Sequence, residues 1–172
     1  MATSAGRTSF YRSVRGSILG GLGILIWDGA VMGSFLTALL VCPVWFVVSV
    51  VKNLIQRPGW RVALVRVSIP ALALGLLLAN NQLQWRIAET NASRVVAACE
   101  AFHAANGSYP QNLDELVPTY LPEIPRAKYC LVFGEFRYYS FGSDSPILVW
   151  FAVPPYGRKI YNFEERRWSY LD

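Results

Sequence analysis

Two long apolar runs dominate the first half of the chain. The run 29–51, GAVMGSFLTALLVCPVWFVVSVV, contains no charge, and a helix of this length at about 1.5 Å per residue exceeds the roughly 30 Å hydrocarbon layer of a bilayer. A second run covers 62–79, and its one charge, Arg66, lies near the end, from where it can extend to the lipid headgroups. The pattern predicts two transmembrane helices, joined by a polar segment in which Pro58-Gly59 indicates a turn.

The stretch 17–28 is apolar but too short to span a bilayer alone, and it has two interpretations. It can lie in the membrane interface as a lead-in helix, with Asp28 capping a helix that begins at Gly29. Alternatively, residues 17–51 form two short spans that turn near Gly33-Ser34, which places both basic segments on the cytoplasmic side. The anchor over residues 1–80 is therefore expected to have two spans, or three under the second interpretation.

Asp28 is the only acid of this anchor, and an acid within an apolar stretch is a candidate functional residue. Gly29 and Gly33 have the four-residue spacing that lets membrane helices approach closely. Asp28, Gly29 and Gly33 are therefore the candidate helix-packing or intramembrane polar site, with capping by Asp28 as the simpler explanation.

The chain beyond Ala79 becomes polar without a helix-breaking residue until Asn106-Gly107. The second span is thus expected to continue from Val62 to Asn106 as one long helix. Its polar part has apolar residues at steps of three and four, which predicts one buried stripe. The members of the stripe are Ile87, Ala88, Val95, Ala98, Cys99 and Phe102.

After Gly107 the chain has a short helical turn near 113–117 and then five strand candidates, at 128–133, 135–141, 146–153, 158–163 and 166–171. Short strands with tight connections predict an antiparallel meander, and one face of it can cover the helix stripe. The expected fold class is an α+β membrane protein. The last transmembrane helix continues into an amphipathic helix that packs on a small antiparallel β-sheet, with residues 81–172 as the surface domain.

The segment 147–153, ILVWFAV, is apolar on both faces, which favours a central strand over a partner-binding surface. Aromatic residues are abundant around it. Most are ordinary sheet residues, but exposed ones can form a recognition patch or lie against lipid headgroups. Trp150, Tyr156 and Trp168 are the candidate interaction surface.

Charge is distributed unevenly along the chain. Residues 1–80 contain seven Lys/Arg and one acid, whereas the remaining residues contain nine bases and ten acids. Basic residues that flank apolar runs are typical of the cytoplasmic side of membrane proteins, whereas a nucleic-acid-binding protein would gather them on its folded domain. The charge pattern therefore predicts the lipid bilayer as a partner, but no nucleic acid.

Motifs for catalysis, cofactors or metals are missing from the sequence. The three cysteines, Cys42, Cys99 and Cys130, have no C-x-x-C spacing, and the single histidine, His103, has no evident nucleophile or orienting acid. Cys99 and Cys130 can form a disulfide from helix to strand in an oxidising compartment, or remain two buried thiols. The sequence predicts a protein that is not an enzyme and uses no cofactor or metal.

The segment 98–125, ACEAFHAANGSYPQNLDELVPTYLPEIP, resembles the region after the long helix of type IV pilins and type II secretion pseudopilins. The matching positions are Glu100, Phe102, Asn106, Gly107, Tyr109, Pro110, Leu113, Leu116, Pro118, Leu121 and Pro125. The specific likeness covers about thirty residues. The resemblance implies a pilin-like domain in the periplasm, anchored in a bacterial inner membrane, and the expected partner of that domain is another membrane or periplasmic protein.

The anchor departs from the pilin pattern. Pilins are cleaved after a glycine just before a single N-terminal span and have a glutamate early in the mature helix. Here another apolar run precedes the span, which begins RVALVRVSIPALAL without a glutamate or a Gly-Phe or Gly-Met site, so neither processing nor filament incorporation is expected. The first hypothesis is a non-enzymatic accessory protein of a secretion, pilus or envelope complex. The alternatives are a membrane-tethered ligand-sensing or small-molecule-binding domain, and an intramembrane enzyme or transporter centred on Asp28.

Overall fold

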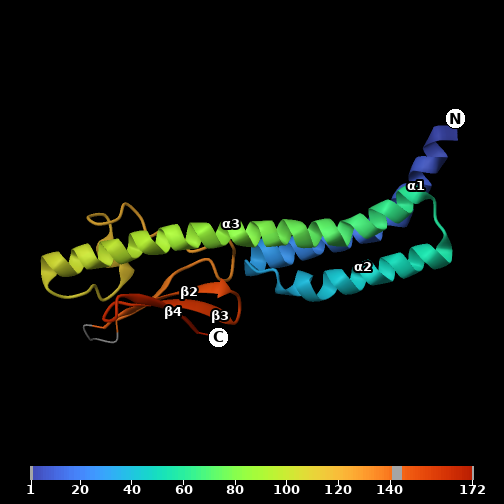
Figure 1. Ribbon diagram of the computed structural model, residues 1–172. Coiled ribbons are helices and arrows are strands. Elements are labelled where there is room, and N and C mark those ends of the chain that lie inside the picture. The colour runs from blue at the N-terminus through green and yellow to red at the C-terminus, as the bar shows by residue number, and fades with distance from the viewer. Residues whose placement is uncertain (1, 141–144, 172) are drawn as a thin grey trace. The chain divides into compact units, whose positions relative to one another are not determined.

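The computed structural model describes residues 2–140 and 145–171, and the chain divides into two compact units, Met1–Asn81 and Gln82–Asp172 (Figure 1). The first unit contains helix α1 (Ala2–Ile24), the π-helix η1 (Leu25–Met32), α2 (Leu36–Gln56) and the first part of α3 (Trp60–Asn106). Three helical segments in the described part of the chain are long and apolar enough to cross a membrane. They are Tyr11–Met32, Leu36–Gln56 and Trp60–Asn106.

The single helix expected over 29–51 is wrong, because the chain breaks between η1 and α2. Gly33 ends η1 with φ 62°, a left-handed conformation that glycine adopts without steric cost, and its N–H donates to the carbonyl oxygen of Asp28. Phe35 is also outside helical geometry, and α2 begins at Leu36. The break lies at the Gly33-Ser34 turn of the second interpretation, so there are three apolar helices.

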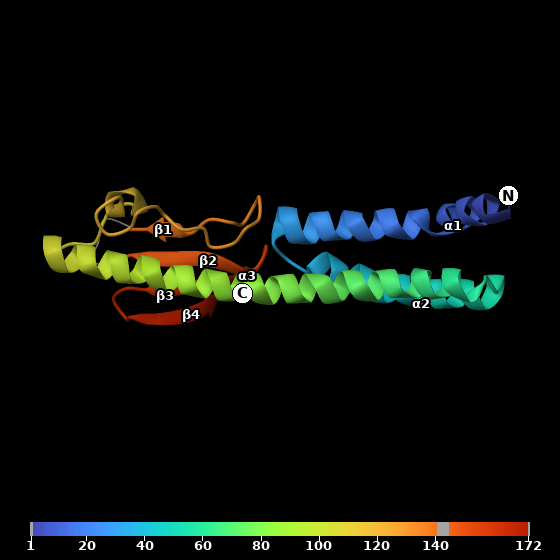
Figure 2. The same ribbon diagram turned by 90° about the horizontal axis from the view of Figure 1, so that it is seen from above.

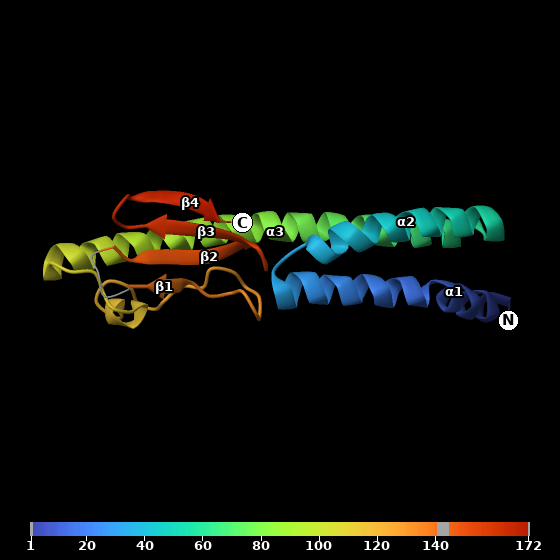
Figure 3. The same ribbon diagram turned by 90° about the horizontal axis from the view of Figure 1, so that it is seen from below.

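Small residues form the buried core of the first unit. Ala38 and Cys42 of α2 pack with Ala73 and Leu77 of α3, and side chains of α1, η1 and the turn surround them. Both views in Figures 2 and 3 show α1 and α2 running along the same part of α3. Most large apolar side chains of α2 face outward, for example Leu40 and Ile55. An apolar exterior around a small-residue core is the pattern of helices that pack inside lipid.

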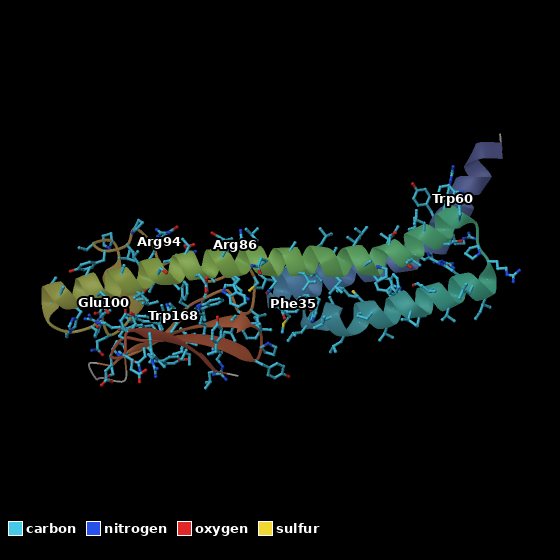
Figure 4. All side chains as sticks on the ribbon, viewed as in Figure 1. Phe35, Trp60, Arg86, Arg94, Glu100 and Trp168 are labelled. Atoms are coloured by element: carbon cyan, nitrogen blue, oxygen red, sulfur yellow. The ribbon has the colours of Figure 1, made fainter. Side chains whose placement is uncertain are left out.

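The long helix α3 is continuous from Trp60 to Asn106, as the sequence predicts, and its second part carries the predicted stripe. The buried members of the stripe in the second unit are Ala88, Ala92, Val95, Ala98 and Cys99. They pack against Leu148 and Phe163 of the sheet region. Arg86 and Arg94 lie on the side of α3 that faces away from the sheet (Figure 4). Gly107, with φ 75°, follows the end of the helix as expected.

The sheet of the second unit is an antiparallel meander in the order β1-β2-β3-β4, as predicted. Its strands are β1 (Arg137–Tyr139), β2 (Ile147–Val153), β3 (Gly157–Asn162) and β4 (Arg167–Leu171). Between α3 and the sheet, the predicted helical turn is the 3₁₀ helix η2 (Leu113–Leu116). Strand β2 lies inside the sheet with five consecutive buried residues, which confirms the central-strand prediction.

The strand expected at 128–133 is wrong, because this segment folds back on itself as a loop. The Lys128 N–H donates to the carbonyl oxygen of Gly134, with the two atoms 3.1 Å apart. A Cβ atom at position 134 would lie only 2.5 Å from the carbonyl oxygen of Cys130, so this close approach requires glycine. The backbone of the loop therefore bonds within itself, whereas a strand would bond to a neighbour.

Candidate functional site

Asp28 caps a helix, but a different helix from the one expected at Gly29. Its side chain is 1% exposed, and Oδ2 accepts a hydrogen bond of 2.7 Å from the backbone N–H of Ala38, in the first turn of α2. A carboxylate is favourable at a helix N-terminus, where backbone N–H groups lack partners. Asp28 therefore joins the end of the first apolar helix to the start of the second across the turn at Gly33.

The other two residues of this candidate site have separate roles. A Cβ atom on Gly29 would lie 3.3 Å from the Leu77 side chain, so Gly29 allows η1 to lie close to α3. Gly33 lies in the turn outside the helices, and its proposed role in helix packing is wrong. The Oδ1 atom of Asp28 has no hydrogen-bond partner among the described residues. Asp28 and Gly33 therefore shape the turn between two apolar helices, whereas Gly29 packs η1 close to α3.

Trp150 is wrong as part of an exposed interaction surface. It lies on the central strand β2, is 0% exposed, and contacts Trp85 of α3 edge-on with ring centroids 6.4 Å apart. Trp150 is buried because both faces of β2 are covered, so the five central side chains of this strand are all buried. Trp150 belongs to the core that joins α3 to the sheet.

Lys128 is buried in the same region, which no pattern in the sequence predicts. Its Nζ donates a 2.7 Å hydrogen bond to the carbonyl oxygen of Ala152, and burial lowers the pKa of its amino group to about 8. The adjacent N–H of Tyr129 donates to Oε1 of Gln84 on α3, at 2.8 Å. These contacts fix the start of the 128–134 loop between the end of β2 and α3.

An exposed apolar group lies at this end of the sheet, and we name it the apolar tip. Its members are Tyr129, Leu131 and Val132 of the loop and Tyr156 of the turn between β2 and β3. Leu131 is 76% exposed and Tyr156 is 72% exposed. The two segments share one end of the sheet, because Lys128 contacts Ala152 and Tyr156 lies in the tight turn after β2, where its N–H donates to the carbonyl oxygen of Val153. The sequence predicts Tyr156 as part of an interaction surface. It places Tyr129, Leu131 and Val132 in a strand instead.

Trp168, the third candidate, is half-buried on β4. Its ring packs on Tyr161 with centroids 5.0 Å apart, and it lies on the sheet side of α3 (Figure 4). Among the described residues, strand β4 pairs with β3 alone. It is the outermost strand in both Figures 2 and 3, and Tyr170 and Leu171 on it are exposed. An open strand edge with exposed apolar side chains can accept a further strand.

At the opposite edge, strand β1 is bonded to the segment that follows α3. The hydroxyl of Tyr138 on β1 donates to the carbonyl oxygen of Pro110, at 2.9 Å. Between β1 and η2 lies a groove of about 450 Å³, whose polar lining includes Asn112, Asp114, Arg126 and Glu135. Its apolar lining includes Phe136, so the groove combines charged and apolar groups.

The cysteine thiols are buried and free, which leaves the disulfide between Cys99 and Cys130 unformed. Cys130 lies in the 128–134 loop outside any strand, and Cys99 lies in the helix stripe. Burial raises the pKa of the Cys99 thiol to about 12. Within residues 2–140 and 145–171, no group of three or more His, Cys, Asp or Glu side chains could hold a metal ion.

No family model, curated protein sequence or solved structure matches this chain.

Proposed function

We propose that this is a non-enzymatic inner-membrane protein of bacteria whose second unit is a pilin-like domain in the periplasm that binds another protein. The apolar tip and the β4 edge are its binding surface. The observation that carries the proposal is the tip: four large apolar side chains are exposed and take no part in the hydrophobic core of the domain. Exposed apolar patches of this kind are typical of protein interaction sites.

The basic residues support the membrane topology. If the three apolar helices each cross the bilayer, Arg12 and Arg15 of α1 and the segment from Lys52 to Arg66 all lie on one side, and the second unit lies on the other. Lys/Arg-rich segments remain on the cytoplasmic side, so the second unit is assigned to the periplasm. A C-terminal alkaline phosphatase fusion tests this topology: activity is expected, and an inactive fusion on an inserted chain would contradict it.

The resemblance to pilins is supported by the positions that carry it. Gly107 ends the long helix in a left-handed conformation, and Tyr109, Leu113 and Leu116 are buried where the chain turns from the helix toward the sheet. The matched residues therefore form one piece of structure, the connection from helix to sheet. This connection is the part of the fold in which the likeness is specific.

Site-specific crosslinking tests the binding surface. A photo-crosslinking amino acid placed at Leu131 or Tyr156 in native membranes is expected to give protein adducts that mass spectrometry can identify. The same probe at Arg94, on the side of α3 away from the sheet, is the control and is expected to give none. Adducts to lipid alone at the tip, or equal protein adducts at Arg94, would refute this surface.

A second candidate function, small-molecule binding, is favoured by the groove between η2 and β1. Its volume of about 450 Å³ lies within the range of ligand sites, and Arg126 and Glu135 supply both charges in its lining. The Arg126→Ala substitution separates the two functions. It would abolish binding of a small ligand in the groove and leave tip crosslinking unchanged.

A further inference from the structure

A basic groove lies among the three helices of the first unit. Its volume is about 420 Å³, and its lining includes Arg12 and Arg15 of α1, Lys52 of α2 and Arg66 of α3. No acidic side chain lines it. Four positive charges in one groove repel one another, so the groove is complementary to an anion.

The guanidinium of Arg66 on α3 is held between α1 and α2. Its Nη1 donates to Oε1 of Gln56 on α2, at 2.9 Å, and its Nη2 donates to the carbonyl oxygen of Ser13 on α1, at 3.3 Å. Both acceptors are uncharged, so neither neutralises the guanidinium. These bonds also fix the position of Arg66 relative to α1 and α2.

The only acid of the first unit is too distant to compensate the groove. From Arg15 to Asp28 the chain is helical throughout, which separates them by about 20 Å at 1.5 Å per residue. A separation of this size rules out an ion pair between them, and Oδ2 of Asp28 already accepts the Ala38 N–H. Among the described residues, none of the four basic groove residues forms an ion pair.

An apolar groove of about 380 Å³ continues from the basic one. The two share Gly16, Ser17 and Trp45, and the apolar groove extends along Gly20 and Ile24 of α1 and Val41 of α2. A Cβ atom on Gly20 would lie 3.1 Å from the Trp45 ring, so glycine allows this ring to lie against α1. A Cβ atom on Gly16 would meet nothing within 4 Å, which shows open space where the grooves join.

We propose that the joined grooves bind one anionic phospholipid. Its phosphodiester lies among Arg12, Arg15, Lys52 and Arg66, and one acyl chain lies in the apolar groove past Gly16 and Trp45. Basic pockets between membrane helices on the cytoplasmic side are suited to anionic headgroups. Free phosphate satisfies the same four cations but leaves the adjoining apolar groove unexplained. The proposal rests on the membrane placement of the first unit stated above.

Native mass spectrometry of the full chain tests the site. The chain is reconstituted in nanodiscs of phosphatidylglycerol and phosphatidylcholine in equal amounts, released into detergent, and its retained lipids are counted. We expect phosphatidylglycerol to be retained preferentially. The double substitution Arg15→Gln/Lys52→Gln is expected to weaken this retention about tenfold or more. Both side chains are exposed at the groove, and Arg66 with its helix contacts is kept.

The matched control is Arg57→Asn/Arg61→Gln, which removes two charges from the turn region between α2 and α3 outside the groove. Asn is used at position 57 because Arg57 has φ 44°, which Asn tolerates. The control is expected to retain phosphatidylglycerol like the wild type. Equal losses in both double variants would show a general charge effect and would overturn the site.

Gly16→Leu separates a phospholipid from free phosphate, because it fills the junction of the grooves and leaves all four cations. Loss of phosphatidylglycerol retention in this variant supports the proposal. Unchanged retention, or complete displacement of the lipid by inorganic phosphate in every variant, would overturn it. Failure of the wild-type chain to insert into nanodiscs would instead refute the membrane placement, so the two failures are distinguishable.

Discussion

The Nζ of Lys128 lies 2.7 Å from the carbonyl oxygen of Ala152, and the lysine side chain is fully buried beside the Trp150 ring. This contact ties the loop of the apolar tip to the end of the central strand. A buried amine is costly to protonate, because the apolar surroundings solvate its charge poorly.

The first prediction concerns pH. In the folded protein the pKa of Lys128 falls to about 8 from an ordinary value of 10.5, so between these values the unfolded chain binds more protons than the folded one. The Lys128 contribution to the free energy of unfolding of the second unit should therefore rise with pH over this window, by up to about 3 kcal/mol, whereas the raised pKa of the Cys99 thiol acts in the opposite direction above about pH 9. Urea unfolding of the full chain in detergent, followed by near-ultraviolet circular dichroism, measures it. Lys128→Met should remove the rise between about pH 8 and 9, below the range in which Cys99 titrates, and an unchanged slope there would contradict the assignment.

The second prediction concerns the cap at the start of α2. Asp28→Ala removes the acceptor for the Ala38 N–H and should destabilise the first unit by about 1–2 kcal/mol. Asp28→Asn keeps an acceptor oxygen and should cost less. Thermal unfolding in detergent compares the two variants. Equal stability of Asp28→Ala and wild type would show that the carboxylate does not cap α2.

The third prediction concerns the left-handed turn. Gly33→Ala places a Cβ at φ 62° and should destabilise the first unit by about 1–2 kcal/mol. Gly23→Ala is the control, because a Cβ there meets nothing within 4 Å and alanine favours helix. The same unfolding measurement should show a lower melting temperature for Gly33→Ala alone.

The fourth prediction separates binding from stability at the tip. Leu131→Ser should change the free energy of unfolding by less than about 0.5 kcal/mol, because the side chain is exposed. It should nevertheless abolish protein adducts formed from a crosslinker at Tyr156. Leu116→Ala, at a fully buried position, should cost about 2–5 kcal/mol. Retained adducts in Leu131→Ser would argue against the tip as a binding surface.

The fifth prediction concerns the thiols. Cys99 and Cys130 are buried and unpaired, and the pKa of Cys99 is raised to about 12, so neither should react with N-ethylmaleimide in the folded protein at neutral pH. Both should react after denaturation without a reducing agent. Labelling that needs prior reduction would reveal a disulfide.

The sequence predicted the long helix and the central strand well, because each depends on one strong local pattern. The stripe through Ala88, Val95 and Cys99 has the helical period, and Asn106-Gly107 ends the helix where a left-handed residue is needed. The segment 147–153 is apolar throughout, which only a strand covered on both faces tolerates.

The errors arose where a contact distant in sequence decides the structure. The sequence left two interpretations for the region around Gly33, and hydropathy could not choose between them because it carries no signal of the bond from the Ala38 N–H to Asp28. The loop 128–134 has an apolar content typical of a strand, but Gly134 allows the chain to fold back and Lys128 bonds to Ala152. Consequently three of the four tip residues could not be predicted as an exposed group.

The small side chains in the buried stripe of α3 limit which substitutions related chains can carry there. Ala88, Ala92 and Ala98 are covered almost completely by neighbouring side chains, so the separation of helix and sheet is set by methyl groups. Enlarging any one of them would push the whole meander outward, whereas the far side of α3, with Arg86 and Arg94, carries no such restriction. Related chains should therefore vary freely on that outer side and keep alanine, glycine or serine along the covered line.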